Sequence, residues 1–156
     1  NRLLQCTIYA LGEKKRRVSL DRVLVLARKG EELILHRDEL NALWELPEKA
    51  LVRGESHEET ARAALGEALG EAVFDVSLLC VYTITGEDGK ESGGYCYVAD
   101  VREWQDEEAS KSRAFSRLPL ASQIKNPALV FALHKWAGEF FDERLEIERL
   151  GQPAPY

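Results

Sequence analysis

The stretch from Trp44 to Gly70 constrains the fold of this chain most strongly, because it carries the signals of a complete helix and of its approach. Ser56 is a favourable N-cap residue, and Glu59 three positions later completes a capping-box pattern. Gly70 can end the helix in the left-handed conformation that other residues resist. Apolar residues recur at helical spacing, namely Ala61, Leu65, Ala68 and Ala72. The pattern predicts a helix over Ser56 to Leu69, entered from a strand through a tight loop, with Leu65 buried.

Length and composition indicate an ordinary globular protein. A chain of 156 residues is expected to form a single domain, 1–156, and is long enough for a substantial core. The net charge of -6 argues against a nucleic-acid-binding surface. No apolar run approaches the roughly 18 to 20 residues of a membrane span, and no signal peptide is visible. The odd, widely spaced cysteines Cys6, Cys80 and Cys96 predict reduced core thiols of a cytoplasmic protein rather than a zinc site or disulfides.

The remaining elements predict an α+β domain. Segments with the composition of strands are Leu3 to Leu11, Arg22 to Arg28, Glu32 to His36, Val73 to Ile84, Gly93 to Val101 and Phe115 to Leu120. A last helix is predicted from Asn126, with Pro127 at its first position, to about Leu145, and its Trp136 and Phe140 are expected to be largely buried. The order of strands, helix, strands and final helix favours an α+β or αβα layered arrangement.

The stretch around the predicted helix resembles the Nudix box, whose pattern is G-x5-E-x7-R-E-U-x-E-E-x-G-U, with U an aliphatic residue. The positions that match are Glu55 at the first Glu, Leu65 at the first aliphatic residue, Glu67 at the first Glu of the later pair and Gly70 at the last Gly. The positions that differ are Lys49 for the opening Gly, Ala63 and Ala64 for Arg-Glu, Ala68 for the second late Glu and Glu71 for the closing aliphatic residue.

The resemblance to small bacterial Nudix proteins extends over most of the chain and implies a mixed β-sheet between helices, an αβα sandwich. It also implies a MutT-like hydrolase that uses Mg²⁺ (or Mn²⁺) to cleave a nucleoside diphosphate linked to another moiety. On this basis Glu67 would be a metal ligand, and Glu108 in the acidic loop would be the distal ligand or base. Glu55 would belong to the catalytic group as an acid that either supports the metal ligands from behind or fixes the loop.

The residues on the helix face bear directly on metal binding. Positions 64, 67 and 68 are three and four residues apart and so share one face of the helix. Three carboxylates there would suit Mg²⁺, but the chain has Ala64, Glu67 and Ala68. Glu71, one turn beyond Glu67, is either a second oxygen ligand or a solvated residue at the helix end. The composition of this face predicts weak or absent hydrolysis.

Two classes of function therefore remain open. One is a Nudix-type hydrolase, and the other is a non-catalytic Nudix-fold module that binds a nucleotide or a protein partner. The final helix could serve as a homodimer interface as easily as core cover. The basic run Lys14 to Arg17 could bind a phosphate or be a solvated loop. His36 could touch a ligand phosphate or lie exposed at a strand end.

Overall fold

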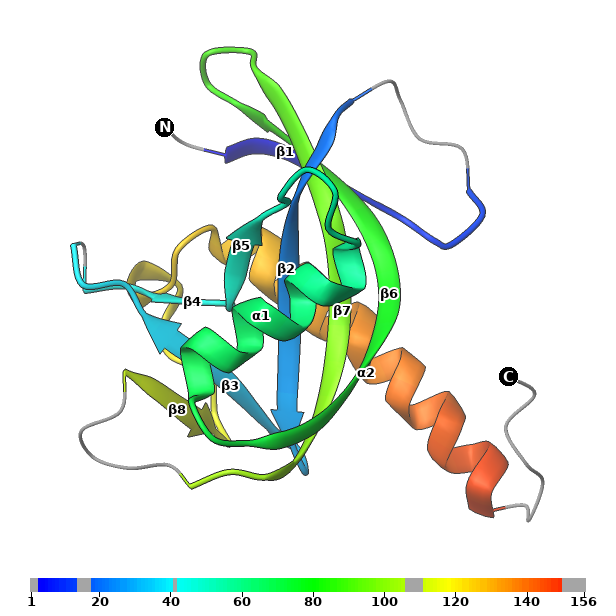
Figure 1. The fold of residues 1–156 in the computed structure, drawn as a ribbon. Helices are drawn as coiled ribbons and strands as arrows, with labels where there is room; N and C mark the ends of the chain where they lie inside the picture. The colour runs from blue at the N-terminus through cyan, green and yellow to red at the C-terminus, as the bar shows by residue number, and fades with distance from the viewer. Residues whose placement is uncertain (1–2, 14–17, 41, 106–110, 150–156) are drawn as a thin grey trace.

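The fold is a twisted mixed sheet with one helix on each face. The computed structural model describes residues 3–13, 18–40, 42–105 and 111–149 (Figure 1). Its strands are β1 (Leu3–Tyr9), β2 (Leu20–Lys29), β3 (Glu32–Arg37), β4 (Trp44–Glu45), β5 (Glu48–Ala50), β6 (Val73–Gly86), β7 (Glu91–Glu103) and β8 (Ser112–Phe115). Its helices are α1 (His57–Leu69), the short 3-10 helix η1 (Ala121–Gln123) and α2 (Pro127–Arg149).

The sheet has the strand order β1-β6-β7-β2-β3-β4, with β5 paired to β2 and β8 paired to β3. Strands β2 and β7 run parallel, and the other pairings within the sheet are antiparallel. In Figure 1, α1 lies in front of β2 and β7 and α2 lies behind the sheet. The predicted α+β class and αβα sandwich are therefore confirmed.

Alternation along β2 divides the core into two layers, because successive side chains of a strand point to opposite faces. Val23 and Val25 belong to the α1-side core, whose fully buried residues include Ala27, Ile34, Ala61, Leu65 and Ala99. Leu24 and Leu26 belong to the α2-side core, whose fully buried residues include Leu35, Cys80, Cys96, Leu133 and Ala137. Each helix thus covers its own hydrophobic layer.

Helix α1 forms as its sequence predicts. Ser56 is the N-cap with an extended backbone, and its hydroxyl accepts a hydrogen bond from the Glu59 N–H at 3.1 Å. Gly70 has a φ of 72° and ends the helix, with its N–H donating to the Gly66 carbonyl at 2.9 Å. Leu65 is fully buried in the α1-side core. The helix and the burial of Leu65 are confirmed.

The predicted strand over Phe115 to Leu120 is wrong beyond its first residue. Strand β8 comes earlier, pairs with β3 and ends at Phe115. Pro119 has no N–H to donate to a sheet, and Leu120 is 72% exposed in the turn that leads to η1. The first strand also ends sooner than predicted, at Tyr9, because a turn follows in which the Glu13 N–H donates to the Ala10 carbonyl.

The final helix begins at Pro127, as predicted, and runs beyond Leu145 to Arg149. This part of α2 packs on the α2-side core through its buried residues Leu129, Val130, Leu133 and Ala137. Trp136 is half-buried rather than largely buried, and it packs against the edge of that core. The side chain of Phe140 lies outside the described residues, and a homodimer stays a prediction.

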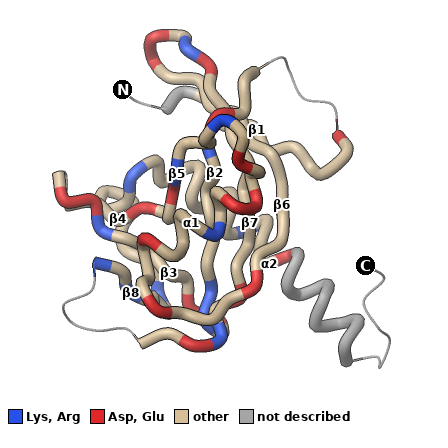
Figure 2. The backbone as a smooth tube through the Cα atoms, in the orientation of Figure 1, with Lys and Arg blue, Asp and Glu red and all other residues tan. Residues whose placement is uncertain are grey.

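The three cysteines have free thiols, and Cys80 and Cys96 are buried opposite each other on β6 and β7. Figure 2 shows Lys and Arg interspersed with Asp and Glu along the described backbone. None of the helices in the described residues is both long and apolar enough to cross a membrane. The basic run Lys14 to Arg17 lies outside the described residues.

Candidate functional site

The box residue Glu67 is bonded to a lysine from the neighbouring strand. Lys49 of β5 donates from Nζ to Glu67 Oε1 of α1 at 2.6 Å. The hydrogen bond to Glu67 raises the pKa of Lys49, and the charges of Glu67 and Glu55 add to the rise while desolvation opposes it. The ammonium of Lys49, at the position of the opening glycine in the Nudix pattern, is therefore bonded to Glu67, the acid of α1 that the resemblance assigns to metal, and lies near Glu55.

Glu55 is fixed in the loop before α1. Its Oε1 accepts a hydrogen bond from the Thr60 hydroxyl at 3.2 Å, and the same hydroxyl lies 3.1 Å from the Ser56 carbonyl. Thr60 is fully buried in the first turns of the helix, so it is a rigid anchor for a half-buried carboxylate. This position fits the predicted loop-fixing role of Glu55, which stays a prediction.

The helix face formed by positions 64, 67 and 68 is only partly open to a ligand. Ala64 is only 3% exposed and packs in the α1-side core, Ala68 is half-buried, and the Glu67 side chain is 65% exposed. The helix ends at Leu69, so the helical spacing that related Glu71 to Glu67 does not continue. Glu71 lies after Gly70 as an exposed residue, and its role as a ligand stays a prediction.

The described residues do not fit a divalent metal ion. Mg²⁺ takes carboxylate oxygens together with phosphate oxygens, and Mn²⁺ favours the same hard donors. The acid that α1 presents here, Glu67, already accepts a hydrogen bond from a cation. In the part of the chain that the structure describes, no cluster of three or more His, Cys, Asp or Glu side chains could hold a metal. Glu108, the predicted distal ligand, lies outside the described residues.

A cavity of about 190 Å³ lies on the opposite face of the sheet, beside α2. Apolar side chains form much of its wall, namely Leu24, Leu46, Ile84, Leu129 and Val130. Its polar lining includes Arg22 paired with Glu48 and Lys125 paired with Glu45, the latter at 3.4 Å. The cavity thus combines an apolar wall with polar groups, as small-molecule sites do.

Two adjacent residues of β5 connect the cavity with the ion pair. Glu48 lines the cavity beside α2, whereas Lys49 reaches α1 on the other face. Strand β5 pairs with β2, with Leu24 opposite Glu48 and Val23 opposite Lys49. The cavity and the ion pair thus lie on opposite faces of the sheet, with β5 contributing one residue to each.

An aromatic cluster that the sequence patterns did not predict lies at the start of α1. The His57 ring stacks on Tyr95 with 4.1 Å between ring centroids and an interplanar angle of 15°, and its Nδ1 is hydrogen-bonded to the Tyr97 hydroxyl. Burial, followed by the charges of Glu58 and Tyr95, raises the pKa of Tyr97 to about 12. The period-two spacing of the tyrosines in β7 was the available signal, since it places both on one face. His36 likewise has a partner, the Ser112 hydroxyl at 3.2 Å from Nδ1.

Solved structures with the same fold are Nudix hydrolases. The Bacillus subtilis pyrophosphohydrolase BsRppH is 22% identical with a TM-score of 0.66, and the match covers 86% of this chain and 90% of that one. A mutT/nudix family protein from Listeria innocua is 14% identical with a TM-score of 0.59, over 85% of this chain and 99% of that one. The Nudix hydrolase RenU of M. smegmatis is 17% identical with a TM-score of 0.51, over 96% and 97%.

The chain therefore has the Nudix fold, which confirms the resemblance found in its sequence. Neither family models nor the sequences of curated proteins give a match to the chain.

Proposed function

We propose that this chain uses the Nudix fold to bind a nucleoside diphosphate linked to another moiety, and that it hydrolyses this ligand slowly or not at all. The observation that carries the proposal is the 2.6 Å hydrogen bond between Lys49 and Glu67. It joins the acid of the box helix to a cation of the protein, and the residue next to Lys49 in β5, Glu48, lines the cavity beside α2 on the other face.

The lining of the cavity supports a ligand with a flat, largely apolar group. Leu24 and Ile84 from the sheet and Leu129 from α2 supply apolar contact area. Ser92 and Asn126 add groups that can donate and accept hydrogen bonds at the same cavity. A nucleobase has this combination of a flat face and a polar edge, and its phosphates would extend past β5.

Slow hydrolysis follows from the charges near Glu67. In metal-assisted phosphoryl chemistry the ion polarises the phosphate and generates the attacking hydroxide. Each loss of about 1.36 kcal/mol of transition-state stabilisation lowers the rate tenfold. A site in which Ala64 and Ala68 supply no oxygen and Glu67 is engaged by Lys49 lacks several such contributions.

A second candidate is a Mg²⁺-dependent hydrolase of the same ligands, and the fold likeness to the Bacillus subtilis pyrophosphohydrolase favours it. In this case Glu67 and Glu108 would hold the metal, Glu71 would be a further ligand and Glu55 would fix the loop. This arrangement requires Glu67 to exchange the Lys49 ammonium for a metal ion.

Binding is tested by titration calorimetry with ADP and with nucleoside diphosphate conjugates. Ser92→Trp fills the cavity and is expected to abolish binding, because Ser92 lines it. The matched control is Ser77→Trp, which places the same side chain at an exposed position of β6 and leaves binding unchanged. Binding that is absent in the parent, or equal in parent and Ser92→Trp, contradicts the proposed ligand site.

Hydrolysis is tested with the same conjugates in Mg²⁺ and in Mn²⁺, comparing the parent, Glu67→Gln and the control Glu139→Gln on the exposed side of α2. We expect turnover far below ordinary enzyme rates of about 1 to 1,000 per second in all three proteins. Ordinary rates in the parent and in Glu139→Gln that are lost in Glu67→Gln would establish the hydrolase instead.

A further inference from the structure

The ion pair between Lys49 and Glu67 adds little to the stability of the fold. Its side chains are 29% and 65% exposed, and ion pairs in contact with water contribute little to folding. The elements that carry it are fixed by other contacts. Strand β5 is hydrogen-bonded to β2, and α1 is held by its buried residues Thr60, Ala61, Ala64, Leu65 and Leu69. A ligand can therefore break or share the ion pair with little loss of folding stability.

The chemistry of the ammonium suits a phosphate group. A lysine ammonium has three N–H donors and binds phosphate oxygens as a point charge. One donor goes to Glu67, and the nearby charge of Glu55 also favours the protonated form of Lys49. A phosphate can take the remaining donors, or can replace Glu67, whose exposed carboxylate can turn to water.

We propose that the Lys49 ammonium takes the place of the divalent metal ion of the Nudix fold and holds a ligand diphosphate directly, so that this site binds diphosphates without metal. The inference rests on the proposed function and deepens it, because it names the group that recognises the phosphates. It follows from the misfit between the donor set and a metal ion: the chain has Ala64 and Ala68 where the Nudix pattern has carboxylates, and it carries a cation at the position of the opening glycine.

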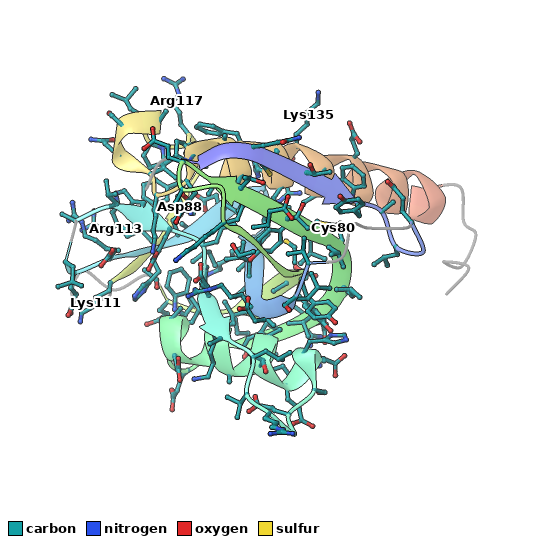
Figure 3. All side chains as sticks on the ribbon, turned by 90° about the horizontal axis from the view of Figure 1, so that it is seen from above. Cys80, Asp88, Lys111, Arg113, Arg117 and Lys135 are labelled. Carbon is teal, nitrogen blue, oxygen red and sulfur yellow. The ribbon has the colours of Figure 1, made fainter. Side chains whose placement is uncertain are left out.

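Inorganic pyrophosphate is the probe, titrated into the whole chain in excess EDTA and monitored by calorimetry. The parent is expected to bind it, and Lys49→Gln is expected to bind about tenfold more weakly or worse, which is the usual loss for one charged hydrogen bond. The matched control is Lys135→Gln, because Lys135 is an exposed residue of α2 on the far side of the sheet from α1 (Figure 3). This control removes the same charge and is expected to leave binding unchanged.

Glu67→Gln gives a test of opposite sign. If Lys49 binds the phosphate, removal of the competing Glu67 charge frees a donor and strengthens pyrophosphate binding in EDTA. If Glu67 is a metal ligand, the same substitution weakens binding in Mg²⁺ and has no effect in EDTA. The Glu67 position is exposed at the helix surface, so the variant keeps the packing of α1.

Each outcome decides between the ideas. Pyrophosphate binding that requires Mg²⁺ and is equal in parent and Lys49→Gln overturns this inference while leaving the proposed ligand class intact. Pyrophosphate that binds in EDTA through Lys49, while nucleoside diphosphate conjugates do not bind, supports the inference and contradicts the proposed function. Absence of binding by any phosphate compound, with or without Mg²⁺, overturns both.

Discussion

Leu65 offers the sharpest test of the packing that places the box helix on the sheet. Its side chain is fully buried in the α1-side core between α1 and the sheet. Leu65→Ala removes a methine and two methyl groups from a site that cannot collapse easily, because the strands beneath it are fixed by their hydrogen bonds. The expected loss is about 2 to 5 kcal/mol in the free energy of unfolding. This is a large share of the roughly 5 to 15 kcal/mol that stabilises a typical domain.

Urea denaturation followed by circular dichroism measures the change. With a slope of about 2 kcal/mol per molar, the midpoint is expected to fall by about 1 to 2.5 M while the slope stays constant. The control is Leu40→Ala, the same chemical change at a side chain that is 93% exposed, for which we expect a change within about 0.5 kcal/mol. A midpoint for Leu65→Ala equal to that of the parent would refute the assignment of Leu65 to the core.

Further predictions concern backbone space, protonation and metal binding. Gly94→Ala is expected to destabilise the chain, because the new Cβ would lie 2.5 Å from the Arg22 carbonyl oxygen of β2. Gly66→Ala is expected to stabilise it by about 0.5 to 1 kcal/mol, because Gly66 lies inside α1 with open space around its Cβ position. Thermal unfolding of both variants and the parent measures the two effects. Burial, and to a smaller extent the charge of the Arg28 guanidinium, lowers the pKa of His134 below its usual 6.5. The unfolded chain then binds the proton more readily, so stability is lost as the pH falls below about 6.5, and urea midpoints at pH 8 and pH 5 should differ less in His134→Gln than in the parent. Ala64→Glu with Ala68→Glu is expected to bind Mg²⁺ more tightly than the parent by calorimetry, but to lower the unfolding midpoint because position 64 is buried.

Local signals in the sequence predicted the parts of the fold that depend on neighbours along the chain. Ser56 and Gly70 fixed the ends of α1 through contacts within a few residues. Strands β2 and β3 likewise cover the predicted segments Arg22 to Arg28 and Glu32 to His36, and the turn between them is at Gly30, which has a φ of 63°. The strand near Phe115 was misplaced because its assignment depends on pairing with β3, about 80 residues earlier in the chain, rather than on local composition.

The candidate site was harder to predict because its contacts are long-range. The sequence identified Glu67, and spacing along an ideal helix indicated which residues share its face. It did not show that Ala64 turns into the core or that Lys49 bonds to Glu67, since both depend on where β5 lies against α1. The stacking of His57 on Tyr95 could not be predicted for the same reason, since it joins α1 to β7.

The short strand β5 makes loop length a determinant of ligand chemistry. Glu48 and Lys49 reach opposite faces of the sheet only because β5 holds one register against β2. A slip of one residue exchanges the faces of a strand's side chains, so a slip that pairs Glu48 with Val23 would bring an acid to Glu67 and turn the ammonium towards the cavity beside α2. A change of one residue in the length of the loop before Glu48 that produces this slip would thus reverse the preferred charge of the ligand without any substitution in the helix.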